Sequence, residues 1–292
     1  MEWRQFVMNL GSLSPDEVEE VMLRHGAQAV TLTDAGDNPV LEPAPGETPL
    51  WNDVRISGLF PAAADLDLLR ADLLASLPVG RLPDHRIESL PDRVWEREWL
   101  KDFRPMQFGR RLWVCPGEFQ VADEGAVVVR LDPGLAFGTG THPTTALCLE
   151  WLDGLELSDK RVLDYGCGSG ILSVASLLLG AGSATAFDID PQAVTATRQN
   201  ARQNRVEDGL TATMDAGVLD DSYDVIVANI LATPLIREAG TICERLARGG
   251  VIALSGIMEH QAAAVIAAYR DRVDFDAPAI IAPWVRLTGK RI

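Results

Sequence analysis

The sequence is short of basic residues. Its 292 residues include 26 Lys and Arg against 42 Asp and Glu, which gives a formal net charge of −16. Non-specific binding to nucleic acid depends on Lys and Arg side chains that neutralise phosphates, so this deficit argues against direct contact with nucleic acid. An acidic surface fits a basic, lysine-rich partner instead.

Long apolar runs are missing as well. No stretch of about 18 apolar residues occurs, which argues against a membrane span. Residues 1–17 contain no basic stretch followed by an apolar block, so a signal peptide is not expected. A length of 292 residues corresponds to about two domains, at the usual 100–200 residues per domain.

Cysteine is scarce and scattered. The four cysteines form no C-x-x-C pair and have no His cluster nearby; they are Cys115, Cys148, Cys167 and Cys243. Structural zinc sites need closely spaced ligand pairs, so no metal site is expected. We expect free thiols in a reducing cytoplasm.

The first part of the chain alternates strands and helices. The pattern predicts strands over 2–9, 28–33, 54–60 and 84–90, a helix after Pro15 and a second helix over 62–77. Ser14 and Glu17 have the spacing of a capping box. The order β-α-β-β-α-β predicts a small α+β, ferredoxin-like domain over residues 1–92. Residues 93–105 are expected to form a linker helix anchored by Trp95 and Trp99, and we hypothesise hinge motion over residues 91–105.

The rest of the chain has a different pattern. Short apolar runs predict strands over 110–114, 126–131, 161–165, 184–189, 210–214, 223–228 and 251–255, with an edge strand in 280–291. Helices are expected over 171–179, 191–204, 232–246 and 260–269. Such alternation indicates an α/β domain, a doubly wound, Rossmann-like parallel sheet with helices on both faces.

A glycine-rich turn lies between the strand over 161–165 and the helix that follows it. Gly166 and Gly168 lack side chains, so the backbone there can approach a ligand closely. Gly170 lets the helix start tightly against the strand. Because ligands bind at the carboxyl edge of such sheets, the turn is a candidate cofactor site. Any tight connection between a strand and a helix would show similar glycines.

Two acids follow the next strand. Asp188 lies 22 residues after Gly166, a spacing at which a carboxylate accepts hydrogen bonds from the ribose hydroxyls of an adenosine cofactor. Asp190 precedes Pro191 and suits a helix N-cap. Asp188 is therefore the better candidate for a cofactor ligand.

The identity of the cofactor is indicated by Asp164, which precedes the glycines in the pattern D-x-G-x-G-x-G. A dinucleotide site favours G-x-G-x-x-G, whose helix N-terminus holds a pyrophosphate. S-adenosylmethionine has no phosphate, and its ammonium group needs acceptors that Asp164 can provide or orient. The pattern favours a methyltransferase over a dehydrogenase.

Three further residues are candidates around this edge. Asn229 follows the strand over 223–228, where its carbonyl oxygen can accept a hydrogen bond from a nucleophilic amine, or simply satisfy a turn. In the stretch 132–145, Phe137 can stack on a ring or pin the loop. His142 is expected to be a hydrogen-bonding residue of the loop rather than a proton-transfer base.

These motifs together resemble the ribosomal protein L11 methyltransferase (PrmA) family. LDPGLAFGTGTHPTT, LDYGCGSGILS, FDIDPQAV and NILATPL occur in the order and at the spacing of that family, over about residues 100–292. The resemblance implies a ferredoxin-like substrate-recognition domain over 1–92 and a class I methyltransferase domain over 106–292. The cofactor-contacting positions of the family match Thr145, Gly166, Asp188 and Asn229.

The resemblance also implies an activity. It is that of a protein N-methyltransferase, which transfers methyl groups from S-adenosyl-L-methionine to lysine and N-terminal amines of ribosomal protein L11, with trimethylation at several amines. The implied partner is free L11 before assembly, and the enzyme is expected to be a cytoplasmic monomer. We expect Asn229 to be the catalytic residue, which orients the amine. Alternatives are a small-molecule or nucleic-acid methyltransferase, a non-catalytic cofactor-binding scaffold and, least favoured, a dehydrogenase.

Overall fold

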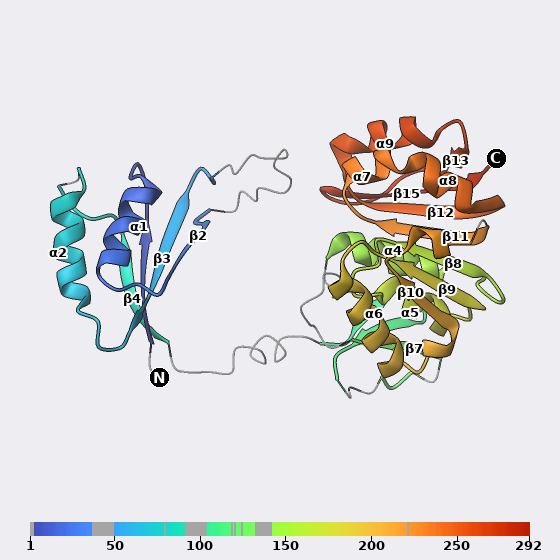
Figure 1. The fold of residues 1–292 in the computed structure, drawn as a ribbon, viewed down its shortest axis with the longest axis horizontal. Helices are drawn as coiled ribbons and strands as arrows, with labels where there is room; N and C mark the ends of the chain where they lie inside the picture. The colour runs from blue at the N-terminus through green and yellow to red at the C-terminus, as the bar shows by residue number, and fades with distance from the viewer. Residues whose placement is uncertain are drawn as a thin grey trace. The chain divides into compact units, whose positions relative to one another are not determined.

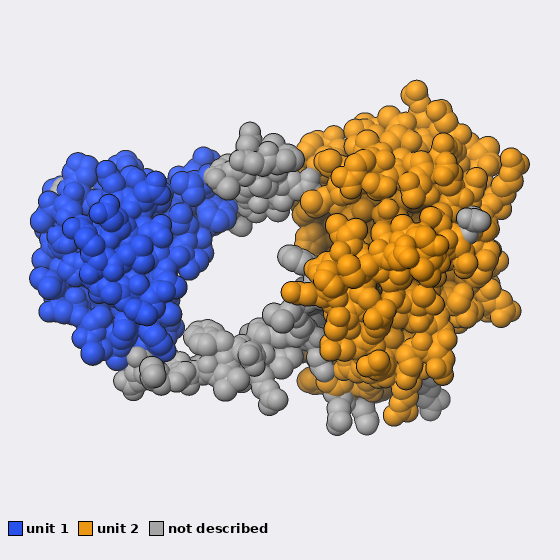
Figure 2. Space-filling view, in the orientation of Figure 1, with its two compact units in different colours: residues 1–98 blue, residues 99–292 orange. Residues whose placement is uncertain are grey.

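The computed structural model describes residues 3–36, 50–78, 80–90, 104–117, 119, 121–123, 125–131, 142–220 and 222–292. The chain divides into two compact units, Met1–Glu98 and Trp99–Ile292 (Figure 2). Two expectations fall outside the described residues: Phe137, and nearly all of the linker helix over 93–105. The domain boundaries at 92 and 106 therefore stay predictions, as does the role of the first domain in substrate recognition.

The first unit contains the six elements expected from the sequence, in the expected order (Figure 1). They are β1 (Trp3–Asn9), α1 (Pro15–Arg24), β2 (Ala29–Asp34), β3 (Val54–Pro61), α2 (Leu66–Ser76) and β4 (His85–Leu90). The strands form an antiparallel sheet in the order β2-β3-β1-β4, with the two ends of this unit's chain, β1 and β4, paired side by side. The ferredoxin-like order is thus present.

The two helices of this unit begin for different local reasons. Ser14 is the N-cap residue of α1, but its side chain makes no capping hydrogen bond, so the expected capping box with Glu17 does not form. In α2 the carboxylate of Asp65 accepts hydrogen bonds from the N–H groups of two first-turn residues, and the helix therefore starts at Leu66 rather than at Ala62. Both helices bury their apolar side chains in one core with Phe6, Ile56 and Phe60 of the sheet; from the helices these are Val18, Val21, Met22, Leu66, Leu69 and Leu73.

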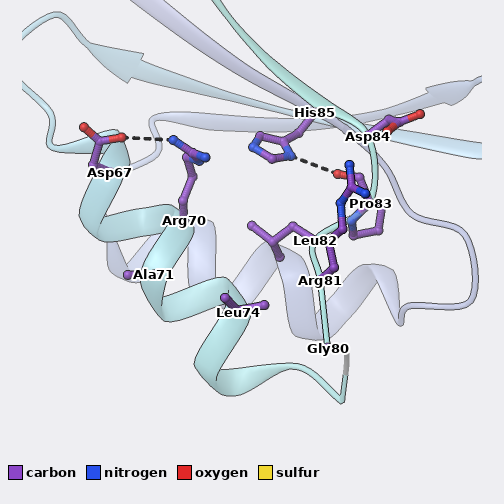
Figure 3. A pocket seen from close by; sticks show the side chains of 10 residues that line it. All are labelled: Asp67, Arg70, Ala71, Leu74, Gly80, Arg81, Leu82, Pro83, Asp84 and His85. Atoms are coloured by element: carbon purple, nitrogen blue, oxygen red, sulfur yellow. Dashed lines mark hydrogen bonds and ion pairs between the residues drawn. The ribbon is translucent and has the colours of Figure 1, made fainter.

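A groove of about 600 Å³ lies in the first unit between α2 and the segment that leads into β4 (Figure 3). Its lining mixes apolar side chains with charges of both signs, and its charged groups are in part paired with one another: Arg70 donates to Asp67 at 3.2 Å. The imidazole of His85 is bound to the carbonyl oxygen of Pro83. None of the candidate site residues lies in this unit.

The second unit contains a three-stranded sheet and a larger eight-stranded sheet (Figure 1). The small sheet has β5 (Met106–Phe108), β6 (Leu112–Cys115) and β7 (Val127–Arg130). The large sheet has β8 (Arg161–Tyr165), β9 (Ser183–Phe187), β10 (Leu210–Thr213), β11 (Tyr223–Asn229), β12 (Leu246–Met258), β13 (Val273–Phe275), β14 (Ala279–Ile281) and β15 (Trp284–Arg291).

The helices of the second unit lie mostly between these strands in the sequence. They are α4 (Pro143–Asp153), α5 (Ile171–Leu178), α6 (Pro191–Gln203), α7 (Ala232–Arg237), α8 (Ala239–Arg245) and α9 (Ala262–Tyr269), with short 3-10 turns at Glu207–Gly209, Ala216–Val218 and Glu259–Gln261. The single helix expected over 232–246 is in fact two helices that meet at Glu238. Within the described ranges, no helix is long and apolar enough to cross a membrane.

The large sheet has the order β10-β9-β8-β11-β12-β15-β13, with β14 also paired to β15. The strands from β10 to β12 are parallel, whereas β15 runs antiparallel to β12, β13 and β14. Two expectations were therefore wrong: the sheet is mixed, and the last strand is not at its edge. β15 lies between β12 and β13 because its eight residues pair with the long strand β12 on one side and with the three-residue strands β13 and β14 on the other.

Two apolar cores cover the two faces of this sheet. Adjacent side chains of a strand point to opposite faces, and accordingly Leu163 packs in one core and Val162 in the other. The first core holds α7, α8 and α9, and the second holds α4, α5 and the three-stranded sheet. Both faces of β8 and β11 are thus buried, which leaves the ends of these strands as the places where polar groups reach solvent.

Candidate active site

The candidate residues meet at the carboxyl edge of the large sheet. The chain leaves β8 towards β9 on one side and enters β11 on the other side, so the strand order reverses between β8 and β11. A crevice forms at such a switch point, and ligands of α/β sheets bind there. Gly166 follows β8, Asp188 follows β9, and Asn229 is the last residue of β11.

The turn after β8 requires its glycines. Gly166, Gly168 and Gly170 have φ values of 82°, 54° and 75°, in the left-handed region that glycine adopts without strain. A Cβ atom on Gly166 would lie 2.3 Å from Cγ2 of Ile230, and one on Gly170 would lie 2.6 Å from Cγ2 of Thr197. The absence of a side chain at Gly170 thus lets the turn pack closely against α6, whereas the sequence had suggested close packing against β8. Gly166 is required by the packing of Ile230, which the sequence did not indicate.

The carboxylate of Asp188 is held by the turn. One oxygen accepts a hydrogen bond from the N–H of Gly168 at 2.9 Å, and the other accepts from the N–H of Asp190 at 3.0 Å. Both bonds come from the backbone, so the orientation of the carboxylate is set before any ligand binds. The side chain is half-buried, and each oxygen keeps a lone pair for a hydroxyl group.

Asp164 is buried on β8, next to the turn. One carboxylate oxygen accepts from the N–H of Ser173 at 3.1 Å and from its hydroxyl at 2.7 Å. The other oxygen, Oδ1, is buried and has no hydrogen-bond partner in the described part of the chain. Burial raises the pKa of this carboxyl to about 7. An unpaired buried oxygen is costly, and it fits an acceptor that a cationic ligand completes.

Asn229 is tied to the first turn of α4. Its amide nitrogen donates to the hydroxyl of Thr145 at 3.3 Å, across 84 positions of the sequence. With the nitrogen bound there, the carbonyl oxygen is the group of Asn229 that accepts a further hydrogen bond. Two of the predicted residues, Thr145 and Asn229, are thus brought together directly.

The roles expected for two polar residues next to these are confirmed. Asp190 is the N-cap residue of α6, and its carboxylate accepts from the N–H of Gln192 at 2.8 Å. His142 is the N-cap residue of α4, with Nδ1 accepting from the Thr144 hydroxyl at 2.8 Å. Burial lowers the pKa of His142, so its imidazole is neutral near pH 7.

Other residues at this edge escaped the sequence analysis. Ile189, directly after Asp188, is 82% exposed, an unusual position for a large aliphatic side chain and a suitable surface for an apolar ring. From α6, Asn200 donates to the carbonyl oxygen of Ser169 at 2.7 Å, and Thr197 donates to that of Gly168 at 3.1 Å. Ile189 could have been predicted from its position directly after Asp188, whereas no local sequence pattern predicts a role for Thr197 or Asn200.

Fold and site together define a class I S-adenosylmethionine-dependent methyltransferase. The strand order with its antiparallel β15, the acid before the glycine turn and the carboxylate after the second strand all belong to this class. The unpaired oxygen of Asp164 fits the ammonium group of S-adenosylmethionine, and the lone pairs of Asp188 fit its ribose hydroxyls.

Comparison with known proteins identifies the protein family to which this chain belongs. The sequence model described as Ribosomal protein L11 methyltransferase (PrmA) matches residues 2–292. A protein of that description from Methylococcus capsulatus is 50% identical over 290 residues, covering 99% of each chain. One from Escherichia coli O8 is 47% identical over 292 residues, covering 100% of each chain.

A solved structure is similar as well. The crystal structure of a ribosomal protein L11 methylase from Lactobacillus delbrueckii subsp. bulgaricus is 32% identical, with a TM-score of 0.60 over 65% of this chain and 99% of that chain. The chain belongs to the ribosomal protein L11 methyltransferase family.

Proposed function

We propose that this protein transfers methyl groups from S-adenosylmethionine to amines of ribosomal protein L11, both lysine side chains and the N-terminal amine. The match to the L11 methyltransferase family over residues 2–292 carries the proposal. The Asn229–Thr145 pair at the switch point supports it, because it leaves the carbonyl oxygen of Asn229 able to accept a hydrogen bond from an amine. We further propose that the enzyme acts as a cytoplasmic monomer on free L11, before L11 joins the ribosome.

Each of these residues would contact a different part of the cofactor. Asp188 would accept hydrogen bonds from the ribose hydroxyls, and exposed Ile189 beside it offers an apolar surface to the base. Asp164 would receive the ammonium group at its unpaired oxygen. When bound, S-adenosylmethionine supplies a methyl group on a positively charged sulfur, which an amine nitrogen can attack.

The protein has to select and orient a neutral amine. A lysine amine with a pKa near 10.4 is neutral about once in 10³ at pH 7, so its deprotonation costs roughly 4–5 kcal/mol, against about 1 kcal/mol for an N-terminal amine. Both groups can lose this proton to water before they dock. The carbonyl oxygen of Asn229 then accepts a hydrogen bond from an amine that still carries an N–H, and so holds the nitrogen lone pair in line with the methyl group in the first two transfers.

Mass spectrometry of L11 tests this function. Purified L11 is incubated with the enzyme and S-adenosylmethionine, and peptides are mapped for mass gains of one to three methyl groups per amine. Gains on lysine and N-terminal residues are expected. If L11 stays unmodified while the cofactor is bound, the substrate is another molecule, and free amines and small RNAs are tried next. Cofactor binding with no acceptor at all would favour the non-catalytic scaffold.

The first prediction concerns Asp188 and its neighbour Asp190. Asp188→Ala removes a charged acceptor and is expected to weaken cofactor binding by roughly 10- to 100-fold, which is the value of one hydrogen bond to a charged group. Isothermal titration calorimetry with S-adenosylmethionine measures the Kd. Asp190→Ala is the matched control, because its carboxylate caps α6. Equal losses in the two variants would show that α6, and not the ribose contact, matters.

A second prediction concerns pH. Burial raises the pKa of Asp164 to about 7 in the free protein, whereas a bound ammonium group favours the ionised carboxylate and lowers this pKa. Below pH 7, binding must therefore displace a proton from Asp164, and the affinity is expected to fall by up to about tenfold for each pH unit between 7 and 5. Above pH 7 it should level off.

The control for the pH dependence is Asp164→Asn, which keeps the shape of the side chain but does not titrate. This variant should bind S-adenosylmethionine more weakly at pH 7.5, with a nearly constant Kd between pH 5 and 7.5. A wild-type Kd that does not change with pH in this range would contradict the contact between Asp164 and the ammonium group.

A further inference from the structure

The connection from β10 to β11 differs from the other parallel connections of the large sheet. α5 connects β8 to β9, α6 connects β9 to β10, and α7 with α8 connects β11 to β12. Residues 214–222, which connect β10 to β11, are fewer than the roughly twelve that such a crossover usually takes, and the helical turn described in them is Ala216–Val218. With this one short turn, residues 214–220, the crossover segment, depend on other groups for their position.

The crossover segment starts beside the cofactor edge. Its first residue, Met214, follows β10, and the carbonyl oxygen of Thr213 before it accepts a hydrogen bond from the N–H of Asp188 at 3.2 Å. Met214 and Ile189 are both exposed, and they follow the paired parallel strands β10 and β9. The segment therefore borders the place where Asp188 would accept hydrogen bonds from the ribose hydroxyls.

One arginine holds both ends of the turn in this segment. The guanidinium of Arg245 donates to the carbonyl oxygen of Ala216 at 3.1 Å through Nη2, and through Nη1 to those of Leu219 at 2.8 Å and Asp220 at 3.2 Å. Arg245 is the last residue of α8, where an arginine ordinarily bonds to the last carbonyl groups of its own helix. Its donors instead reach a segment that lies 25 to 29 positions earlier in the chain.

A guanidinium is suited to holding such a turn. Its planar fork carries five N–H donors in fixed directions, so one side chain reaches three carbonyl oxygens, whereas lysine is a single point of charge. Nε of Arg245 is buried and has no partner within the described ranges. Because an unpaired buried donor is costly, the three bonds to the crossover segment have to offset that cost. Capping of α8 alone does not explain this arrangement.

We propose that Arg245 is a positioning residue for the cofactor, which fixes the crossover segment and so keeps its first residues beside Asp188 in the arrangement that receives the adenosine end of S-adenosylmethionine. A ligand that binds when the segment is in place has an apparent affinity that falls with the fraction of such molecules. The proposal concerns cofactor binding alone and does not depend on which acceptor is methylated.

Three substitutions test the proposal. Arg245→Met keeps an apolar stem and removes all five donors, whereas Arg245→Lys keeps the charge without the fork. Tyr223→Phe removes a separate tie, the hydroxyl that accepts from the N–H of Asp220 at 3.0 Å. Arg248→Met, three positions after Arg245 at an exposed site, is the matched control. For each variant we would measure amide hydrogen exchange of the free protein and the Kd values for S-adenosylmethionine and for adenosine.

In Arg245→Met we expect the amides of residues 216–220 to exchange at least tenfold faster, because the segment opens more often. The Kd values for S-adenosylmethionine and adenosine should both rise about tenfold, since the two ligands share the adenosine end. Arg245→Lys and Tyr223→Phe should change exchange and Kd in the same direction by less, and Arg248→Met should match wild type. Asp164→Asn gives the contrast, because it should weaken S-adenosylmethionine without weakening adenosine.

Wild-type exchange of residues 216–220 in Arg245→Met would overturn the proposal, as would faster exchange with an unchanged Kd for adenosine. A Kd that rises for S-adenosylmethionine alone would also overturn it, because the effect would then lie at the amino-acid end of the cofactor. Circular dichroism shows whether Arg245→Met is folded. If it is not, Arg245→Lys and Tyr223→Phe are judged by the same two measurements, and wild-type values in both variants would overturn the proposal.

Discussion

Asn229→Ala is expected to lower kcat for L11 methylation by about 10²- to 10³-fold, the usual cost of losing one preorganised polar group at a reacting centre. In the proposed mechanism the carbonyl oxygen of Asn229 is the acceptor that orients the amine, and alanine offers none. The cofactor Kd should change far less, because the hydrogen-bonding groups of Asp188 and Asp164 remain. Single-turnover methylation of L11, followed by mass spectrometry, measures the rate of the chemical step.

Thr145→Val is the companion variant for Asn229. It is nearly the same size as threonine and leaves Asn229 in place, but it removes the hydroxyl that accepts from the amide nitrogen at 3.3 Å. The amide can then rotate, so we expect a smaller fall in kcat, about tenfold. An Asn229→Ala enzyme that keeps more than a tenth of the wild-type kcat would contradict the catalytic role of Asn229.

Gly166→Ala is expected to lower the free energy of unfolding by about 2–5 kcal/mol and to abolish measurable cofactor binding. Two costs add: an alanine at φ 82° carries strain of about 1–2 kcal/mol, and forcing a methyl group into a packed site typically costs about 1–3 kcal/mol. The new Cβ would lie 2.3 Å from Cγ2 of Ile230, a β-branched residue with little rotamer freedom. Chemical denaturation followed by circular dichroism measures the loss.

The control for Gly166 is Gly180→Ala. Gly180 has φ 109°, but a Cβ there would meet no atom within 4 Å, so only the strain applies. This variant should lose about 1–2 kcal/mol and bind S-adenosylmethionine normally. If the two alanine variants lose equal stability and both bind the cofactor, the contact between Gly166 and Ile230 is unimportant. Ile230 follows Asn229 directly, so a shift of Ile230 in Gly166→Ala would also disturb the acceptor side.

Much of the first unit and of the cofactor edge could be predicted because the relevant signals are local. The turn after β8 combines a strand, three glycines and a helix within ten positions, and Asp190 caps α6 through a residue two positions away. The six elements of the first unit follow from apolar periodicity. Even locally the prediction of a helix start at residue 62 was wrong, since the side chain of Asp65 caps α2, which begins at Leu66.

The partners of these residues were decided by the tertiary structure. A strand such as β15 shows its buried face in the sequence but not its neighbours, and its place inside the sheet follows from pairing with β12, whose paired residues lie 26 to 39 positions earlier. The need for glycine at position 166 comes from Ile230, and the ring of His142 contacts the ring of Trp284, across gaps of 64 and 142 positions. The sequence by itself determined the class of cofactor and predicted the edge of the sheet at which it binds, through chemistry carried by neighbouring residues. Which side chains contact one another at that edge was decided by packing between distant segments, because steric fit and burial are properties of the assembled core.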